Sequence, residues 1–112
     1  MKDDRLYLVH IRECIDRIQI YTSEGKDAFF TDTKTQDAVL RNLHTLSEST
    51  QRLSDELRAK HPQTDWRGIS GYRNVLVHDY LGISLHRVWE IVTDNLPGLK
   101  REIESILAEM GE

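Results

Sequence analysis

The chain has 112 residues, the size of a single domain (residues 1–112). Its 15 Lys and Arg against 19 Asp and Glu give a formal net charge of −4, which disfavours a protein that coats nucleic acid broadly but allows a local basic cleft. A content of 38% hydrophobic and 30% charged residues with 2 Pro and 6 Gly is typical of a soluble helical protein and excludes disordered or collagen-like chains. The longest apolar run is Leu6–Val9, no signal peptide begins the chain, and the lone Cys14 excludes an internal disulfide, so we expect a cytoplasmic protein without a membrane span.

Apolar residues recur at steps of three and four throughout the chain, which predicts α-helices, and no stretch alternates as a strand does. The first helix is expected over 3–21, followed by a connection over 22–33 that the Phe29–Phe30 pair pins to the core. A long second helix is expected over 35–60. It stops at His61-Pro62, because the residue before a proline is pushed out of the helical region.

The second half of the chain predicts two more helices. Asp65 can cap a short helix over 66–80 that Gly82 ends, and a last helix over 84–110 contains Pro97, which should kink it. The expected fold is all-α, an antiparallel four-helix bundle with a short third helix. The residues expected to face its core are Tyr7, Leu8, Ile11, Cys14, Ile15, Ile18 and Tyr21, then Val39, Leu40, Leu43, Leu46, Leu53 and Leu57, and finally Leu85, Val88, Trp89, Val92, Leu99, Ile103 and Ile106.

The segment 66–80 carries the densest set of chemically active side chains. On an ideal helix Arg73 and Tyr80 share a face, whereas His78 points about 140° away, so the arginine and the histidine meet one ligand only across the helix end or between two subunits. A guanidinium holds phosphate and an imidazole moves protons near neutral pH, which together suit RNA cleavage without a metal. The structural alternative is a surface arginine and a histidine that stabilises a helix C-terminus.

Three other patterns have simpler explanations. The glycine spacing of Gly68–Gly71 matches the RNA-clamping loop of KH domains, but that fold needs strands, so close helix packing is the preferred interpretation. His10 and Cys14 have the spacing of half a zinc site without a second half, which favours a buried inert thiol. A polar stripe on the second helix is either a solvated face or the lining of a cleft with a partner subunit, and consists of Asp37, Arg41, His44 and Glu48.

The residues from Arg73 to Tyr80 read Arg, four residues, His, one residue, Tyr, and here the chain resembles the HepT-like branch of the HEPN superfamily, the toxin half of HepT/MNT toxin–antitoxin modules. The similarity covers most of residues 3–107. The segments that carry it besides the signature are Thr35–Leu43, Asp65–Arg67, Gly71–Asn74, Val88–Trp89 and Asn95–Pro97.

The resemblance implies a dimeric HEPN-type bundle in which two motifs face a shared cleft. It also implies a metal-independent endoribonuclease without a cofactor that acts on RNA and not on DNA, because a ribose 2′-hydroxyl attacks the adjacent phosphorus and leaves a 2′,3′-cyclic phosphate. Arg73 would hold the scissile phosphate and its developing charge, and His78 would be the acid/base. Asn74, Asp79 and Glu48 would support them, with Glu48 at a position where the family carries a glutamate.

The resemblance further implies regulation by a cognate nucleotidyltransferase antitoxin, which would adenylylate Tyr80, as in a type VII-like module. Two alternatives remain open: a non-catalytic helical partner that is only the substrate of the nucleotidyltransferase, and a nucleotide-binding bundle. A homodimer is expected on a second ground, because the aromatic side chains of Trp66, Tyr72 and Tyr80 should lie exposed near the motif, and aromatics concentrate at interfaces.

Overall fold

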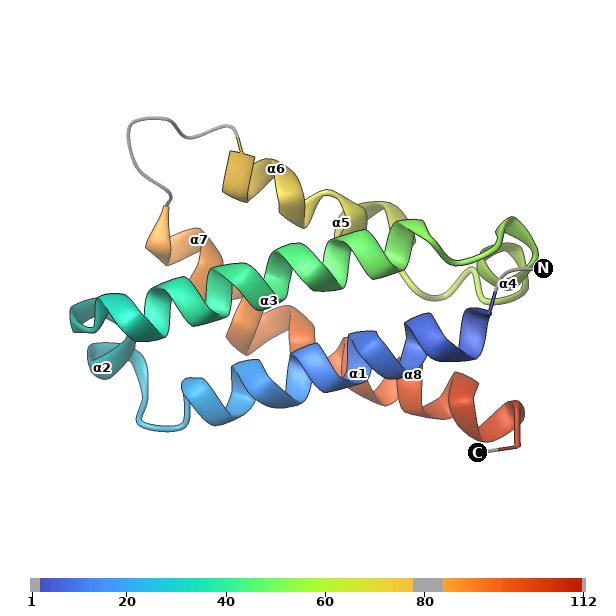
Figure 1. Ribbon diagram of the computed structural model, residues 1–112, viewed down its shortest axis with the longest axis horizontal. Helices are drawn as coiled ribbons and strands as arrows, with labels where there is room; N and C mark the ends of the chain where they lie inside the picture. Colours follow the sequence, from blue (N-terminus) through green and yellow to red (C-terminus); the bar gives the residue numbers. More distant parts are fainter. Residues whose placement is uncertain (1–2, 78–83, 112) are drawn as a thin grey trace.

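The computed structural model describes residues 3–77 and 84–111, and every regular element in these two ranges is helical, which confirms the all-α class (Figure 1). The elements are α1 (Asp4–Tyr21), α2 (Lys26–Thr31), α3 (Thr33–Gln51), α4 (Asp55–Lys60), α5 (Trp66–Ser70), α6 (Tyr72–Val77), α7 (Leu85–Glu90), the π-helical turn η1 (Ile91–Asn95) and α8 (Leu96–Glu109). Within the described ranges, no helix combines the length and the apolar character that a membrane span requires.

Helix α1 forms as expected. The carboxylate of Asp3 caps it by accepting the Leu6 N–H at 3.1 Å, and the chain leaves the helix at Thr22, whose hydroxyl donates to the Ile18 carbonyl at 2.8 Å. The middle of its apolar stripe is buried, but Tyr21, which was also expected inside, is 40% exposed because the helix ends there.

The connection after α1 is more ordered than the sequence indicated. Residues 26–31 form the short helix α2, preceded by Gly25 at φ +98°, a backbone conformation that favours glycine. Phe29 is fully buried and its ring lies 5.4 Å from that of Phe30 and 5.3 Å from that of Trp89. The prediction that this pair pins the connection to the core is therefore confirmed, although a helix supplies it.

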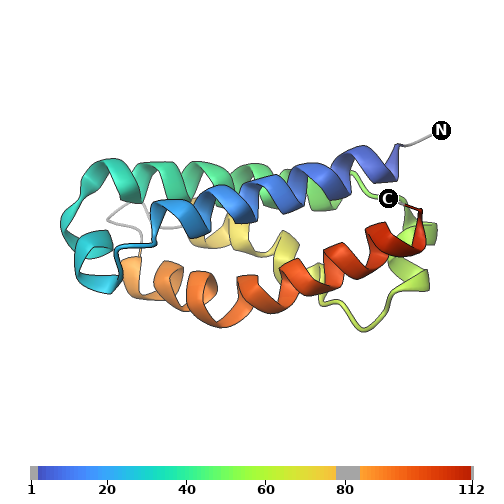
Figure 2. The same ribbon diagram turned by 90° about the horizontal axis from the view of Figure 1, so that it is seen from below.

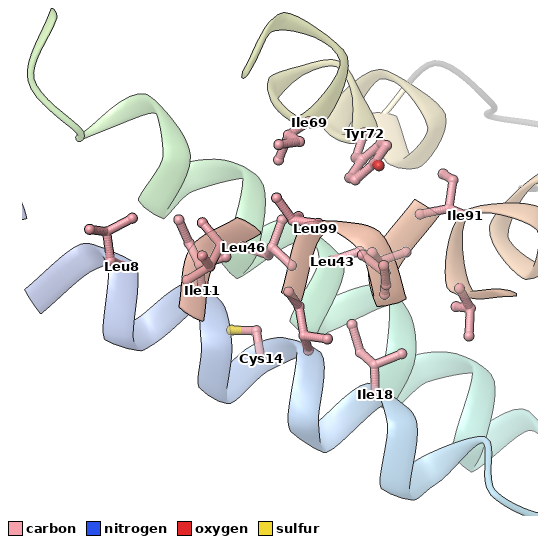
Figure 3. Close-up of a cluster of buried hydrophobic side chains, with 14 of the residues drawn as sticks. Leu8, Ile11, Cys14, Ile18, Leu43, Leu46, Ile69, Tyr72, Ile91 and Leu99 are labelled. Carbon is pink, nitrogen blue, oxygen red and sulfur yellow. The ribbon is translucent and has the colours of Figure 1, made fainter. Parts of the chain in front are cut away.

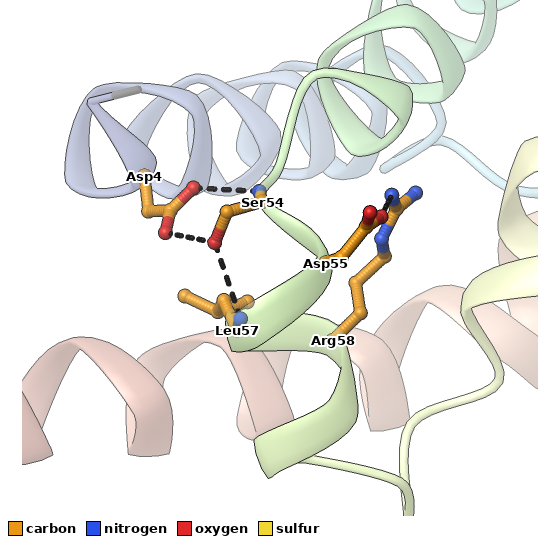
Figure 4. A network of polar contacts seen from close by, with 5 residues as sticks. All are labelled: Asp4, Ser54, Asp55, Leu57 and Arg58. Carbon is orange, nitrogen blue, oxygen red and sulfur yellow. Dashed lines mark hydrogen bonds and ion pairs between the residues drawn. The ribbon is translucent and has the colours of Figure 1, made fainter. Parts of the chain in front are cut away.

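The prediction of one helix over 35–60 is wrong, because the chain leaves helical geometry between α3 and α4. Figure 4 shows the contacts at this break: the Asp4 carboxylate accepts the Ser54 backbone N–H at 2.8 Å and the Ser54 hydroxyl at 2.6 Å. The same hydroxyl oxygen accepts the Leu57 N–H at 3.1 Å and so caps α4. The predicted stop at His61 is confirmed, since α4 ends at Lys60.

The helix expected over 66–80 is divided. Asp65 caps α5 as predicted, by accepting the Gly68 N–H at 3.0 Å, but a turn at Gly71 separates α5 from α6. Helix α6 is described as far as Val77, and the predicted end at Tyr80 and the stop at Gly82 lie outside the described residues.

The last helix continues from α7 to α8 through a π-helical turn. Pro97 lacks an N–H, and its ring excludes the carbonyl four residues earlier, so regular α-helix cannot pass through this position. In η1 the Leu96 N–H donates to the Ile91 carbonyl, five residues back, and Pro97 falls in the first turn of α8, where no donor is needed. The expected disturbance is present, as a widened turn before the proline.

The long helices lie side by side, with α1 packed along α3 and against α8, while α5 and α6 pack on α3 (Figures 1 and 2). The shape is elongated, with extents of 41 × 27 × 21 Å and a radius of gyration of 14.1 Å. Figure 3 shows the core between them. Among the predicted core residues, those fully buried are Leu8, Ile11, Ile15, Ile18, Val39, Leu43, Leu46, Leu53, Val88 and Ile103.

Candidate functional site

The first residues of the signature lie on α6, against the C-terminal end of α3. Arg73 is half-buried, and its Nη1 donates a hydrogen bond to Oε1 of Gln51, the last residue of α3, at 3.1 Å. Asn74 is exposed on the same helix. The structure therefore presents a guanidinium and an amide at the surface where α6 meets α3.

The rest of the signature lies outside the described residues. His78, Asp79 and Tyr80 follow directly after Val77, the last residue of α6. Of the signature, the structure therefore describes Arg73 and Asn74 on α6. The roles of His78 as acid/base and of Tyr80 as AMP acceptor stay predictions from the sequence.

A buried hydrogen bond fixes the start of the motif helices (α5 and α6) on α3. The hydroxyl of Ser47 is fully buried and donates to the Ile69 carbonyl at 3.2 Å, so α5 is joined to the C-terminal part of α3 four residues before Arg73. The alternative of an unsatisfied carbonyl in the core would be costly. This contact fixes how closely α5 approaches α3 and at which residue of α3 it lies.

The two glycines of the motif helices serve close packing, as preferred over an RNA-clamping loop. A Cβ at Gly68 would collide with the Asp65 carboxylate that caps α5. A Cβ at Gly71 would lie 3.2 Å from the Gly68 carbonyl oxygen and 3.4 Å from that of Arg67, both on rigid backbone. The turn between α5 and α6 is therefore tight because it lacks side chains.

Two of the three aromatic residues that were expected to be exposed at a dimer interface pack into or against the core instead. Tyr72 is only 6% exposed, and its burial raises the pKa of its phenol above the usual value. Trp66 packs against the core, and its indole N–H donates to the His61 carbonyl at 2.9 Å. The aromatic argument for a dimer is therefore wrong for Tyr72 and weak for Trp66, because these rings complete the core under the motif.

The polar stripe of α3 leads to the Arg73 contact. Asp37, Arg41 and His44 are exposed, and His44 Nε2 lies 3.3 Å from Glu48 Oε1, one turn along the helix. Gln51 is the next member of the same stripe and was not predicted as a site residue. Its spacing of three residues from Glu48 was the available signal, but nothing in the sequence showed that α6 would approach there.

The possible metal ligands do not form a site in the described part of the chain. His10 is exposed, whereas Cys14 is buried, and burial raises the pKa of its thiol. A protonated, buried thiol is a poor ligand and nucleophile. In residues 3–77 and 84–111, no three His, Cys, Asp or Glu side chains gather closely enough to hold a metal ion.

A polar hollow of about 330 Å³ lies between the motif helices and the π-helical turn. Asp65 and Tyr72 line it from one side, and Arg87, Asn95 and Glu102 from the other. Neither Arg73 nor Asn74 is part of its lining, so the signature residues that the structure describes lie on a different surface.

Comparison with known proteins places these features in a family. A Methanocaldococcus jannaschii protein named "Gamma-glutamylcyclotransferase and putative RNase" is 37% identical over 110 residues, which are 97% of this chain and 50% of that protein, so the chain spans half its length. A second protein of that organism, named "Putative RNase", is 36% identical over 97% of this chain and 91% of its own length. A Thermococcus cleftensis protein named "Probable ribonuclease HepT" is 33% identical over 89% of this chain and 92% of its own length.

No solved structure matches the chain significantly. The HepT-like family model, described as "Ribonuclease HepT-like", matches residues 11–106, a span that includes all of α3 and both motif helices. The match therefore contains the Arg73–Gln51 contact and the whole signature to Tyr80. The chain belongs to the HepT-like ribonuclease family.

Proposed function

We propose that the chain is a metal-independent endoribonuclease, the toxin of a type VII-like HepT/MNT toxin–antitoxin module, folded as a single HepT-like HEPN domain over residues 1–112. The observation that carries the proposal is Arg73. Its guanidinium is held at the surface by a neutral amide, and the described residues place no carboxylate within ion-pair distance of it. A guanidinium in that state keeps its full charge for a phosphate.

The proposed reaction is an internal transfer at one phosphate. The ribose 2′-oxygen forms a bond to phosphorus, the bond from phosphorus to the 5′-oxygen of the next nucleotide breaks, and a 2′,3′-cyclic phosphate remains. Arg73 stabilises the charge that develops on the phosphoryl oxygens. His78 is the acid/base that takes the 2′-hydroxyl proton or supplies the proton to the leaving 5′-oxygen. Asn74, Asp79 and Glu48 support these two residues.

The proposal includes two partners. One is a second copy of the chain. Each copy is an antiparallel four-helix bundle with a short motif-bearing third helix, and each contributes one motif to a shared cleft. Light scattering should then give about twice the chain mass of 13.1 kDa. A monomer at micromolar concentration contradicts the shared cleft. The other partner is a nucleotidyltransferase antitoxin that adenylylates Tyr80.

The deciding experiment follows cleavage of a 5′-labelled RNA by the purified, unmodified protein. Cleavage should persist with excess EDTA and give cyclic-phosphate ends. His78→Ala should lower the rate by about 100-fold or more, the usual contribution of an acid/base, while the circular dichroism spectrum keeps its helical form. His10→Ala, at an exposed position on α1, is the matched control and should cut at the parental rate. Equal rates for His78→Ala and the parent would contradict the acid/base role of His78, and no cleavage by the unmodified parent would favour the non-catalytic partner.

A further inference from the structure

The hydrogen bond between Arg73 and Gln51 joins the signature to a residue outside it. Arg73 Nη1 donates to Gln51 Oε1 at 3.1 Å, across 22 residues of chain. Within the ranges 3–77 and 84–111, Gln51 is the side chain that contacts the Arg73 guanidinium through a hydrogen bond, and no described ion pair includes Arg73. We propose that Gln51 is a positioning residue, which orients the Arg73 guanidinium toward the scissile phosphate; this inference rests on the proposed ribonuclease function.

The chemistry of the amide explains why glutamine suits this position. A guanidinium has five N–H donors, and the amide oxygen uses one of them while adding no charge. A carboxylate at the same place would form a strong ion pair with Arg73 and compete with RNA phosphate for it. Gln51 therefore restricts the rotation of the side chain and leaves the positive charge and the remaining donors for the substrate.

The neighbouring acidic residue of the stripe has a different partner. Glu48 lies one turn earlier on α3, and its carboxylate pairs with His44 at 3.3 Å. The stripe thus presents a paired carboxylate and then a neutral amide as it approaches α6. The described hydrogen-bond partner of Arg73 on this stripe is therefore the neutral amide and not the carboxylate.

The position of Gln51 is itself fixed by three contacts at the end of α3. The Arg52 N–H donates to the Ser49 carbonyl at 3.1 Å and closes the last turn. Three residues after Gln51, the carboxylate of Asp4 holds Ser54. Four residues before it, Ser47 joins α3 to α5. The amide is therefore presented by a helix end that is anchored on both sides.

The first test measures the arginine directly and needs no cleavage. Side-chain NMR relaxation of the Arg73 Nε–Hε group should show a restricted guanidinium in the parent and a lower order parameter in Gln51→Ala. Gln19→Ala, on α1, is the matched control and should leave the Arg73 signal unchanged. An Arg73 order parameter equal in Gln51→Ala and the parent overturns the positioning role, whether or not the protein is a ribonuclease.

The second test uses an added charge. With an RNA made non-cleavable by a 2′-deoxy scissile nucleotide, Gln51→Glu should bind about tenfold more weakly than the parent, a loss of about 1.4 kcal/mol, because the new carboxylate competes with RNA phosphate for Arg73. With cleavable RNA the loss should appear in KM more than in kcat, and the pH profile set by His78 should keep its shape. Gln19→Glu controls for the added negative charge and should bind as the parent does.

A double variant separates the contact from a general effect on the surface. In an Arg73→Ala background, Gln51→Glu should produce no further loss of binding, because its effect passes through the arginine. An equal loss in both backgrounds overturns the inference. If the parent fails to cut any RNA, the proposed function fails, while the relaxation measurement still decides the role of Gln51.

Discussion

The carboxylate of Asp4 accepts hydrogen bonds from both the backbone N–H and the hydroxyl of Ser54, 50 residues later in the chain. This clasp joins the start of α1 to the residue that caps α4, directly after the break that follows α3 (Figure 4). Both bonds are partly buried and one partner is charged, so water replaces them poorly.

Asp4→Ala should therefore lower the free energy of unfolding by about 1.5–3 kcal/mol. Ser54→Ala should have a similar effect, because it also removes the α4 cap on the Leu57 N–H. Urea denaturation of the two single variants and the double variant measures their coupling. The double variant should lose less than the sum of the two, since the same clasp is removed in each. Additive losses would contradict the clasp.

Ser47→Ala should loosen the motif helices from α3. The change leaves the buried Ile69 carbonyl without its donor, which costs about 1–3 kcal/mol of stability. It should also reduce RNA cleavage severalfold in protein that remains folded, because α5 leads directly into the Arg73 helix. Thr45→Ala is the matched control: its hydroxyl donates within α3, to the Arg41 carbonyl at 3.1 Å, and is exposed. Equal activity in the two variants would contradict the positioning by Ser47.

The features of the fold that depend on residues close in sequence could be predicted, whereas those that depend on contacts between distant residues could not. The period of apolar residues predicted the buried faces of α1 and α3, since burial follows from local geometry. The apolar period did not show the break after Gln51, where Ser54 caps α4 locally and binds Asp4, a residue remote in the chain. The helix α2 was missed for a similar reason: its stability comes from the packing of Phe29 on Trp89.

The residues of the candidate site were likewise only partly predictable from the sequence. The resemblance pointed to Arg73 and Asn74 from their order in the chain, and the structure places both on α6, where Arg73 contacts the last residue of α3. Gln51 belongs to no signature, and its role depends on the approach of α6 to α3, which no spacing within α3 specifies. Tyr72 was expected at an interface because sequence gives the type of side chain and not the direction in which it points.

The stability of the protein should fall as the pH rises above about 8.5, the ordinary pKa of a thiol. Burial raises the pKa values of Cys14 and Tyr72, so between the ordinary and the raised values the folded state binds more protons than the unfolded state. The free energy of unfolding then decreases with pH. Urea titrations from pH 7 to 11 should show a shallower decline for Cys14→Ala in the lower part of the range and for Tyr72→Phe in the upper part. Parental slopes in both variants would contradict this assignment.

The last prediction concerns Tyr80 as the regulatory switch of the proposed toxin. Transfer of AMP from ATP to the phenol oxygen forms a phosphodiester and releases pyrophosphate, which adds one negative charge and the bulk of a nucleoside two residues after His78. The new charge would pair with the Arg73 guanidinium, whose described partner is only a neutral amide, and would compete with RNA phosphate for it. Modified protein should therefore bind and cut RNA poorly while its helical content stays the same.

Incubation with the cognate nucleotidyltransferase and ATP, followed by mass spectrometry of the intact protein and its peptides, tests the prediction. The mass should rise in steps of one AMP, and the peptide that contains Tyr80 should carry them. Tyr80→Phe should escape modification and keep its ribonuclease activity in the presence of the transferase, whereas the control Tyr21→Phe, on the exposed end of α1, should be modified and inhibited as the parent is. Arg73→Lys should still be modified, because the acceptor oxygen is untouched. Modification at any residue other than Tyr80, or full activity of the modified protein, contradicts the switch: the inhibition described here requires the added phosphate to lie where it can pair with Arg73.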